Sequence, residues 1–181
     1  MDFTHANWSY LPANYKWPYL FQRVYLGAYY PKFRELLIDA KTRAAERGAF
    51  YWSTFGFRSI ATQQALYTAY KAGTGGKAAP PGKSAHQYGL ADDSTFDLAL
   101  TPGLQPSWRE ADYNILGEEL KRAGLVWGAG FGDRPHANYP AFVSGAQLLP
   151  LYRLWNNCPK GMTDDARLLE IWRYLDTLPP V

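Results

Sequence analysis

The chain has 181 residues, of which 19% are charged and 17% aromatic, and its formal net charge at pH 7 is +3. An average globular protein contains about 25% charged residues, so this composition indicates one folded domain with a real core and excludes a disordered chain. The single cysteine excludes an internal disulfide.

Residues 1–30 are rich in aromatic side chains whose spacing fits neither a helix nor a strand. We expect these residues to form an aromatic N-terminal arm packed on one domain that spans residues 31–181, because rings contribute much of the burial energy of a core. A platform for a sugar or peptide ligand is the alternative. The ring-bearing residues are Phe3, Trp8, Tyr10, Tyr15, Trp17, Tyr19, Phe21, Tyr25, Tyr29 and Tyr30.

The first regular elements are predicted between residues 31 and 73. Pro31 opens a helix with apolar residues at helical spacing, and Gly48 ends it. Residues 49–55 favour a strand, and Ser59 can cap a second helix that runs to Gly73.

The segment from residue 73 to residue 83 is rich in glycine and proline and predicts a loop. It closes on Gly82, Lys83 and Ser84, as a phosphate-binding loop does. The first glycine of that motif would fall at position 77, which is Lys77, so we reject this interpretation.

Residues 90–100 alternate between apolar and polar side chains, which predicts a strand. The alternation places Asp93 and Asp97 on one face and Asp92 on the other. Further on, the pattern from Ser107 to Glu110 resembles a capping box that opens a helix.

The remaining elements follow from Gly124, where that helix is expected to end. Residues 125–127 predict a short strand, and residues 128–132 a turn. Residues 148–155 form a helix-like run that we expect to be broken at Pro150. A last helix opens at Thr163 and carries an apolar stripe that we expect to pack on the core, with a ligand-binding face as the alternative: Leu168, Ile171, Trp172 and Leu175.

Histidine and carboxylate side chains gather in two separate segments. His86 precedes Asp92, Asp93 and Asp97, and His136 follows Asp133 by three residues. Imidazole and carboxylate groups are zinc ligands, and a catalytic zinc ion usually has three protein ligands and one open position. The two segments together therefore suggest a hydrolytic zinc site.

Three motifs in order carry a resemblance to a known family. The pattern Ser84-x-His86-x-x-Gly89-x-Ala91-x-Asp93 resembles the signature of zinc peptidases that include VanY-type D-alanyl-D-alanine carboxypeptidases and L-alanyl-D-glutamate endopeptidases, among them phage endolysins. Two further pieces agree in order and spacing, and the resemblance covers roughly residues 30 to 140. These pieces are Gly56-Phe57-Arg58-Ser59 with Gln63, and Trp127-Gly128 with Asp133-x-x-His136.

The resemblance implies a Zn²⁺ ion bound by His86, Asp93 and His136. Asp93 stands seven positions after His86, as the family pattern requires, and Asp92 is expected to face away. Asp97 is the rival ligand, or an acceptor that orients a histidine.

Four other residues receive roles from the same resemblance. Asp133 is expected to act as the catalytic base, with a salt bridge to the neighbouring arginine or capping of the turn as the alternative. Arg58 resembles a clamp for a substrate carboxylate, or is a structural arginine. Ser84 and Gln63 are expected to contact substrate or to brace the loop.

The expected fold is α+β, a small antiparallel sheet flanked by helices, of the D-alanyl-D-alanine carboxypeptidase type. The expected protein is a monomeric zinc metallopeptidase that hydrolyses bacterial peptidoglycan as an endolysin. L-alanyl-D-glutamate endopeptidase activity is preferred, and D-alanyl-D-alanine carboxypeptidase activity is the alternative. A non-catalytic wall-binding module with a structural zinc ion is the alternative from another class.

The same interpretation includes expectations about partners and location. No basic stripe for nucleic acid is found, and no signal peptide or membrane span, which needs ~18 apolar residues, is found either. We therefore expect no nucleic-acid binding and no membrane insertion. The protein is expected to be made in the host cytoplasm and to act on the cell wall after release.

Overall fold

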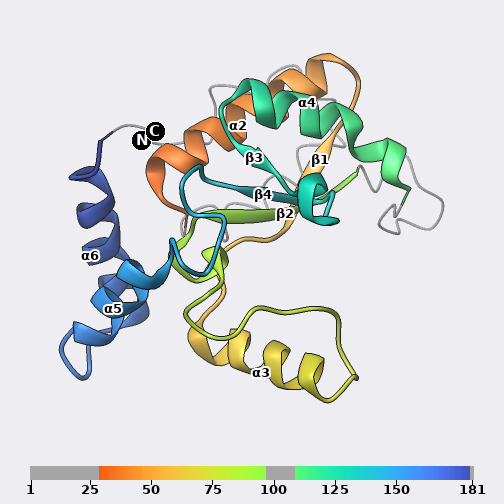
Figure 1. Cartoon of the computed structure of the whole chain (residues 1–181). Helices are drawn as coiled ribbons and strands as arrows, with labels where there is room; N and C mark the ends of the chain where they lie inside the picture. The colour runs from red at the N-terminus through yellow and green to blue at the C-terminus, as the bar shows by residue number, and fades with distance from the viewer. Residues whose placement is uncertain (1–28, 97–108, 180–181) are drawn as a thin grey trace.

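A four-stranded antiparallel sheet forms the centre of the protein (Figure 1). The structure, a computed structural model, describes residues 29–96 and 109–179. The strands are β1 (Tyr51–Phe55), β2 (Ala91–Phe96), β3 (Val126–Trp127) and β4 (His136–Asn138), in the spatial order β1-β2-β4-β3. The predicted α+β class with a small antiparallel sheet is confirmed.

Helices flank this sheet on both sides. Figure 1 shows α2 and α4 together on one side and α3 on the other, while α5 and α6 pack against each other at one end. None of the described helices has the length and apolar character needed to cross a membrane. The α-helices are α2 (Pro31–Glu46), α3 (Ile60–Lys71), α4 (Asn114–Arg122), α5 (Leu149–Asn157) and α6 (Asp164–Asp176), and the short 3₁₀ helices are η1 (Ala85–Tyr88), η4 (Glu110–Tyr113) and η5 (Gly128–Phe131).

Local capping chemistry explains where several helices begin. Pro31 occupies the first turn of α2. The hydroxyl of Ser59 accepts a hydrogen bond from the backbone of Thr62 at the start of α3, and Thr163 caps α6 in the same way. Each cap satisfies a backbone N–H that has no partner within the helix. The predicted start of each of these helices is confirmed.

Pro150 does not break the run from 148 to 155: α5 begins at Leu149 and holds Pro150 in its first turn, where a missing N–H costs no helical hydrogen bond. Ser107 of the expected capping box lies outside the described residues, as does Asp97. Glu110 opens the 3₁₀ helix η4, and α4 begins after it.

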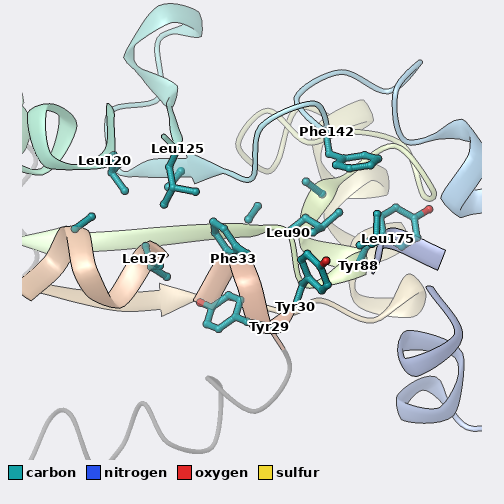
Figure 2. Close-up of a cluster of buried hydrophobic side chains, with 14 of the residues drawn as sticks. Tyr29, Tyr30, Phe33, Leu37, Tyr88, Leu90, Leu120, Leu125, Phe142 and Leu175 are labelled. Carbon is teal, nitrogen blue, oxygen red and sulfur yellow. The ribbon is translucent and has the colours of Figure 1, made fainter. Parts of the chain in front are cut away.

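Buried aromatic and aliphatic side chains pack between α2, the sheet and the C-terminal helices (Figure 2). The expected arm, residues 1–30, lies outside the described residues except for Tyr29 and Tyr30, which are each 1% exposed. The predicted division into an arm and one domain stays a prediction. The apolar stripe of α6 is confirmed as core packing, because Leu168, Ile171 and Leu175 are buried and Trp172 packs against the core.

A buried ion pair joins α2 to the face of β2 that is turned toward this helix. Lys41 Nζ lies 3.0 Å from Asp92 Oδ2, and the two side chains are 5% and 0% exposed. The hydroxyls of Tyr29 and Ser94 also donate to the Asp92 carboxylate, and Lys41 donates to Ser53. Asp92 therefore faces away from Asp93, as predicted, and its charge is fully compensated inside the protein.

We predict that Lys41→Met lowers the free energy of unfolding by about 3–5 kcal/mol, because it leaves the Asp92 charge buried without its cation. Urea denaturation measures this change. The matched control is Arg173→Met, which breaks the exposed pair with Glu170 and should cost less than about 1 kcal/mol. Equal effects of the two substitutions would show that the buried pair does not hold β2 against α2.

Candidate metal site and catalytic cleft

A 3₁₀ helix and a left-handed glycine position His86. The side chain belongs to η1, which ends at Gly89 with φ +68°, and this turn directs the chain into β2. His86 is 3% exposed, and its Nδ1 lies 2.6 Å from the carbonyl oxygen of Gly56. Because a carbonyl can only accept, Nδ1 carries a hydrogen, and the neutral ring then presents the lone pair of Nε2 to the cleft.

The register of the sheet brings Asp93 and His136 together. They are directly opposite each other in the antiparallel pair of β2 and β4, where side chains on one face are neighbours. His136 Nδ1 lies 2.6 Å from Asp93 Oδ1. Two residues that are 43 positions apart in sequence thus meet through strand pairing alone.

The segment that leads to His136 is held by Trp127 and Gly128. The indole nitrogen of Trp127 donates to the carbonyl of Arg134 at 2.7 Å, and the backbone N–H of Asp133 donates to Gly128. A Cβ at Gly128 would lie 2.1 Å from the Asp133 carbonyl oxygen and 2.8 Å from the Cβ of His136. Only glycine therefore allows this close approach between the two segments.

One ligand atom each from His86, Asp93 and His136 lies within 4.8 Å of the other two. His86 Nε2 faces Asp93 Oδ2 at 3.4 Å, so an imidazole lone pair and a carboxylate oxygen point at the same place. Zinc bonds of 2.0–2.2 Å in a tetrahedron separate ligand atoms by about 3.3 Å. The donor types, the 3.4 Å between His86 and Asp93 and the tautomer of His86 fit a zinc ion.

The charges in this cluster shift its protonation equilibria. Burial opposes ionisation of Asp93, but the charges and hydrogen bonds of His86 and His136 outweigh it and hold the pKa of Asp93 well below its usual range. Burial also opposes protonation of His136, yet its hydrogen bond and ion pair with Asp93 raise its pKa. The carboxylate is therefore ionised at neutral pH, which metal binding requires.

Asp133 lines the same cleft as the three candidate ligands. Partial burial and the negative charge of Asp93 raise the pKa of Asp133, which suits a group that accepts a proton near neutral pH. The alternative salt bridge to Arg134 is not formed among the described residues. Arg134 pairs with Glu110 at 3.1 Å and donates to Asn114 instead.

The three predicted substrate residues line this cleft, whose volume is about 680 Å³. Arg58 Nη2 lies 2.5 Å from Asp93 Oδ2, while its Nε is buried and has no partner in the described part of the chain. Gln63 donates to the carbonyl of Ala79 at 2.8 Å and so braces the loop before Ser84, which is itself buried at the cleft wall. Their roles toward a substrate stay predictions.

Several cleft residues are absent from the sequence prediction. Asn138 lies two residues after His136 on the same face of β4, and strand alternation would have indicated it had β4 been recognised. Lys77 and Lys83 line the cleft from the loop between α3 and η1. Phe131, Val143 and Gly145 also line it, and no local pattern signals their position.

Comparison with solved structures finds similar folds at low identity. The L-Ala D-Glu endopeptidase ChiX of Serratia marcescens is 23% identical with a TM-score of 0.44, over 62% of this chain and 81% of that one. A mutant of the vancomycin-resistance D,D-pentapeptidase VanY from a VanB-type cassette, in complex with Zn(II), is 21% identical with a TM-score of 0.46, over 76% of this chain and 82% of that one. No curated protein matches the sequence.

The sequence itself carries the family assignment. The profile of the VanY family, described as D-alanyl-D-alanine carboxypeptidase, matches residues 29–136. This region includes α2, the whole sheet up to the first residue of β4, and each of the seven predicted site residues. The resemblance stated from the three motifs is thereby confirmed, and the chain belongs to the VanY D-alanyl-D-alanine carboxypeptidase family of peptidases.

Proposed function

We propose that this protein is a zinc-dependent peptidase that hydrolyses stem peptides of bacterial peptidoglycan, as an L-alanyl-D-glutamate endopeptidase. The observation that carries the proposal is the meeting of His86, Asp93 and His136 within 4.8 Å in one cleft with Asp133. Three protein ligands leave a position for water, as in a catalytic zinc site.

A second candidate is D-alanyl-D-alanine carboxypeptidase activity, which the description of the matching family favours. It needs the same three ligands and a cation that binds the terminal carboxylate of the substrate. Arg58 is the residue proposed for that role, because its guanidinium lies at the cleft wall and its buried Nε has no partner among the described residues.

The chain's own residues suggest how the reaction is divided among them. Zinc at this site would lower the pKa of a bound water to near neutrality and polarise the scissile carbonyl. Asp133 accepts the proton that the attacking water releases and passes it to the leaving amine. The Gly56 carbonyl keeps His86 in the tautomer that presents Nε2, and Arg58 orients the carboxylate of Asp93.

The proposal includes the biological setting expected from the sequence. As an endolysin the protein would act as a monomer on peptidoglycan, after synthesis in the host cytoplasm and release by a separate membrane-permeabilising protein. Its formal charge of +3 is compatible with approach to an anionic wall.

The first test is digestion of isolated sacculi, with mass spectrometry of the products. We expect soluble stem peptides that lack the first alanine, loss of activity with a chelator, and recovery with zinc. Loss of a single terminal alanine would instead support the carboxypeptidase. Binding to sacculi without any product, in zinc-loaded protein, would support a wall-binding module and overturn the peptidase proposal.

We predict that Asp133→Asn keeps the fold and the zinc ion but lowers kcat by at least about 100-fold, because the amide cannot accept the proton. Zinc content is measured by elemental analysis and the fold by thermal unfolding. The control is Asp165→Asn, which lies at the exposed start of α6 and should retain full activity. Full activity of Asp133→Asn would exclude Asp133 as the base.

The stability of the chelator-treated protein should depend on pH in a defined direction. His136 has a raised pKa in the folded state, so its pairing with Asp93 stabilises the fold at low pH and is lost as pH rises through that pKa. The lowered pKa of Asp93 makes its contribution disappear as pH falls below about 4. Urea unfolding between pH 3 and pH 9 should show a maximum between these limits.

Zinc should reverse the alkaline limb of this profile, because deprotonation of His136 favours metal binding. Asp93→Asn is the control, since it removes the charge that couples the two groups and should flatten the profile of the chelator-treated protein. A wild-type profile that is flat from pH 5 to pH 9 would contradict the coupling.

A further inference from the structure

Two lysines line the cleft in addition to the candidate zinc ligands. Lys77 and Lys83 belong to the loop between α3 and η1, and both side chains are exposed. Neither has an ion-pair partner within residues 29–96 and 109–179. Because neither lysine pairs with a carboxylate of the protein there, each is available to bind an anionic group of a ligand.

The backbone at Lys83 is firmly held. The N–H of Gly82 donates to the side chain of Gln87 at 2.6 Å, and its carbonyl accepts from the Tyr88 hydroxyl at 3.0 Å. Gly82 has φ +80° and lies against the ring of Tyr152 on α5, with no room for a Cβ. Lys83 thus projects from a backbone that is held at Gly82 by Gln87, Tyr88 and Tyr152.

The aliphatic stem of Lys83 is supported as well. It packs on Gly145, where a Cβ would lie only 3.1–3.2 Å from Lys83 Cβ, Cγ and Cδ. Gly145 and Tyr152 follow residue 136, where the match to the family ends. Part of the support for this cation therefore comes from the region that the family profile does not cover, while Gln87 and Tyr88 lie inside the matched region.

The Asp93 carboxylate deeper in the cleft is already paired. Asp93 contacts Arg58, His86 and His136, so the guanidinium of Arg58 is partly committed to a candidate zinc ligand. Lys83 and Lys77 are the lining cations that remain without a carboxylate in the described ranges. A ligand anion that reaches this wall meets them rather than the Asp93 cluster.

We propose that Lys83, assisted by Lys77, binds a carboxylate of the substrate other than the carbonyl under attack. This selects acidic stem peptides over their amidated forms. The inference rests on the proposed function, because it places a stem peptide in this cleft. Two carboxylates of a stem peptide share the required chemistry: the free α-carboxylate of a γ-linked D-glutamyl residue and the C-terminal carboxylate.

The test uses three synthetic stem peptides: the free acid, the peptide amidated at the D-glutamyl α-carboxyl, and the peptide amidated at its C-terminus. Binding is measured by calorimetry with the chelator-treated full chain, where no turnover is expected, and kcat/KM is measured with the zinc-loaded chain. Lys83→Gln, Lys77→Gln and the double variant are compared with Lys160→Gln. Lys160 is exposed between α5 and α6 and does not line the cleft.

We expect the wild type to prefer the free acid over one of the two amides. Lys83→Gln should reduce that preference by roughly two- to fivefold, as the loss of one partly screened ion pair implies. Lys77→Gln should have a smaller effect, and Lys160→Gln should keep the wild-type preference. The amide that binds more weakly than the free acid identifies the carboxylate, and added salt should weaken the preference.

The outcomes separate this inference from the proposed function. If the wild type binds the free acid and amide equally, or if Lys83→Gln keeps the full preference, the lysine site is excluded even when the peptide is cleaved. If the preference in binding is present and depends on Lys83 but no peptide is cleaved, the anion site stands and the proposed peptidase activity fails.

Discussion

The arrangement of the cleft depends on the alternation of two consecutive carboxylates in β2. Asp92 points to the α2 side, where Lys41 and the Tyr29 hydroxyl compensate its charge. Because side chains in a strand alternate with a period of two, fixing Asp92 on that side fixes Asp93 on the other. A register shift of one residue would bury Asp93 beside Lys41 and turn Asp92 to the cleft, where the pairing with His136 would be lost. The buried ion pair between Lys41 and Asp92 therefore also fixes the register of β2, and with it the orientation of Asp93.

The two sides of the sheet are also connected through Gly56. The Tyr29 ring occupies the space in which a Cβ at Gly56 would lie, so only glycine lets the backbone pass so close to the core. The carbonyl of the same residue then accepts the hydrogen of His86 Nδ1. The tautomer of a candidate zinc ligand is therefore set by a backbone group whose position depends on a buried tyrosine. The orientation of His86 in the metal site thus depends on how Tyr29 packs against Gly56.

Local patterns predicted much of this fold and its chemistry, and tertiary contacts explain what they missed. Pro31, Ser59 and Thr163 mark helix starts through capping, and the alternation from residue 90 separates Asp92 from Asp93. Three residues are too few to show a strand period, so β4 and the pairing of His136 with Asp93 could not be read from spacing. The expected break at Pro150 is absent because proline is tolerated in the first turn of a helix and disrupts only its interior. The cleft positions of Lys83 and Gly145 depend on packing between segments that are far apart in sequence.

The distribution of charge in the cleft suggests a division between chemistry and selectivity. Asp93 has three cationic or potentially cationic partners, and this surplus keeps it ionised and oriented in a site where burial alone would favour protonation. Arg58 therefore already holds the carboxylate of Asp93, and only its remaining donors are available to a substrate. The cations left for a substrate lie on the loop that packs against Gly145 and Tyr152, and these two residues follow the region matched by the family. In this arrangement β2, β4 and the adjoining turns supply the reacting groups, and the C-terminal segment helps to support Lys83.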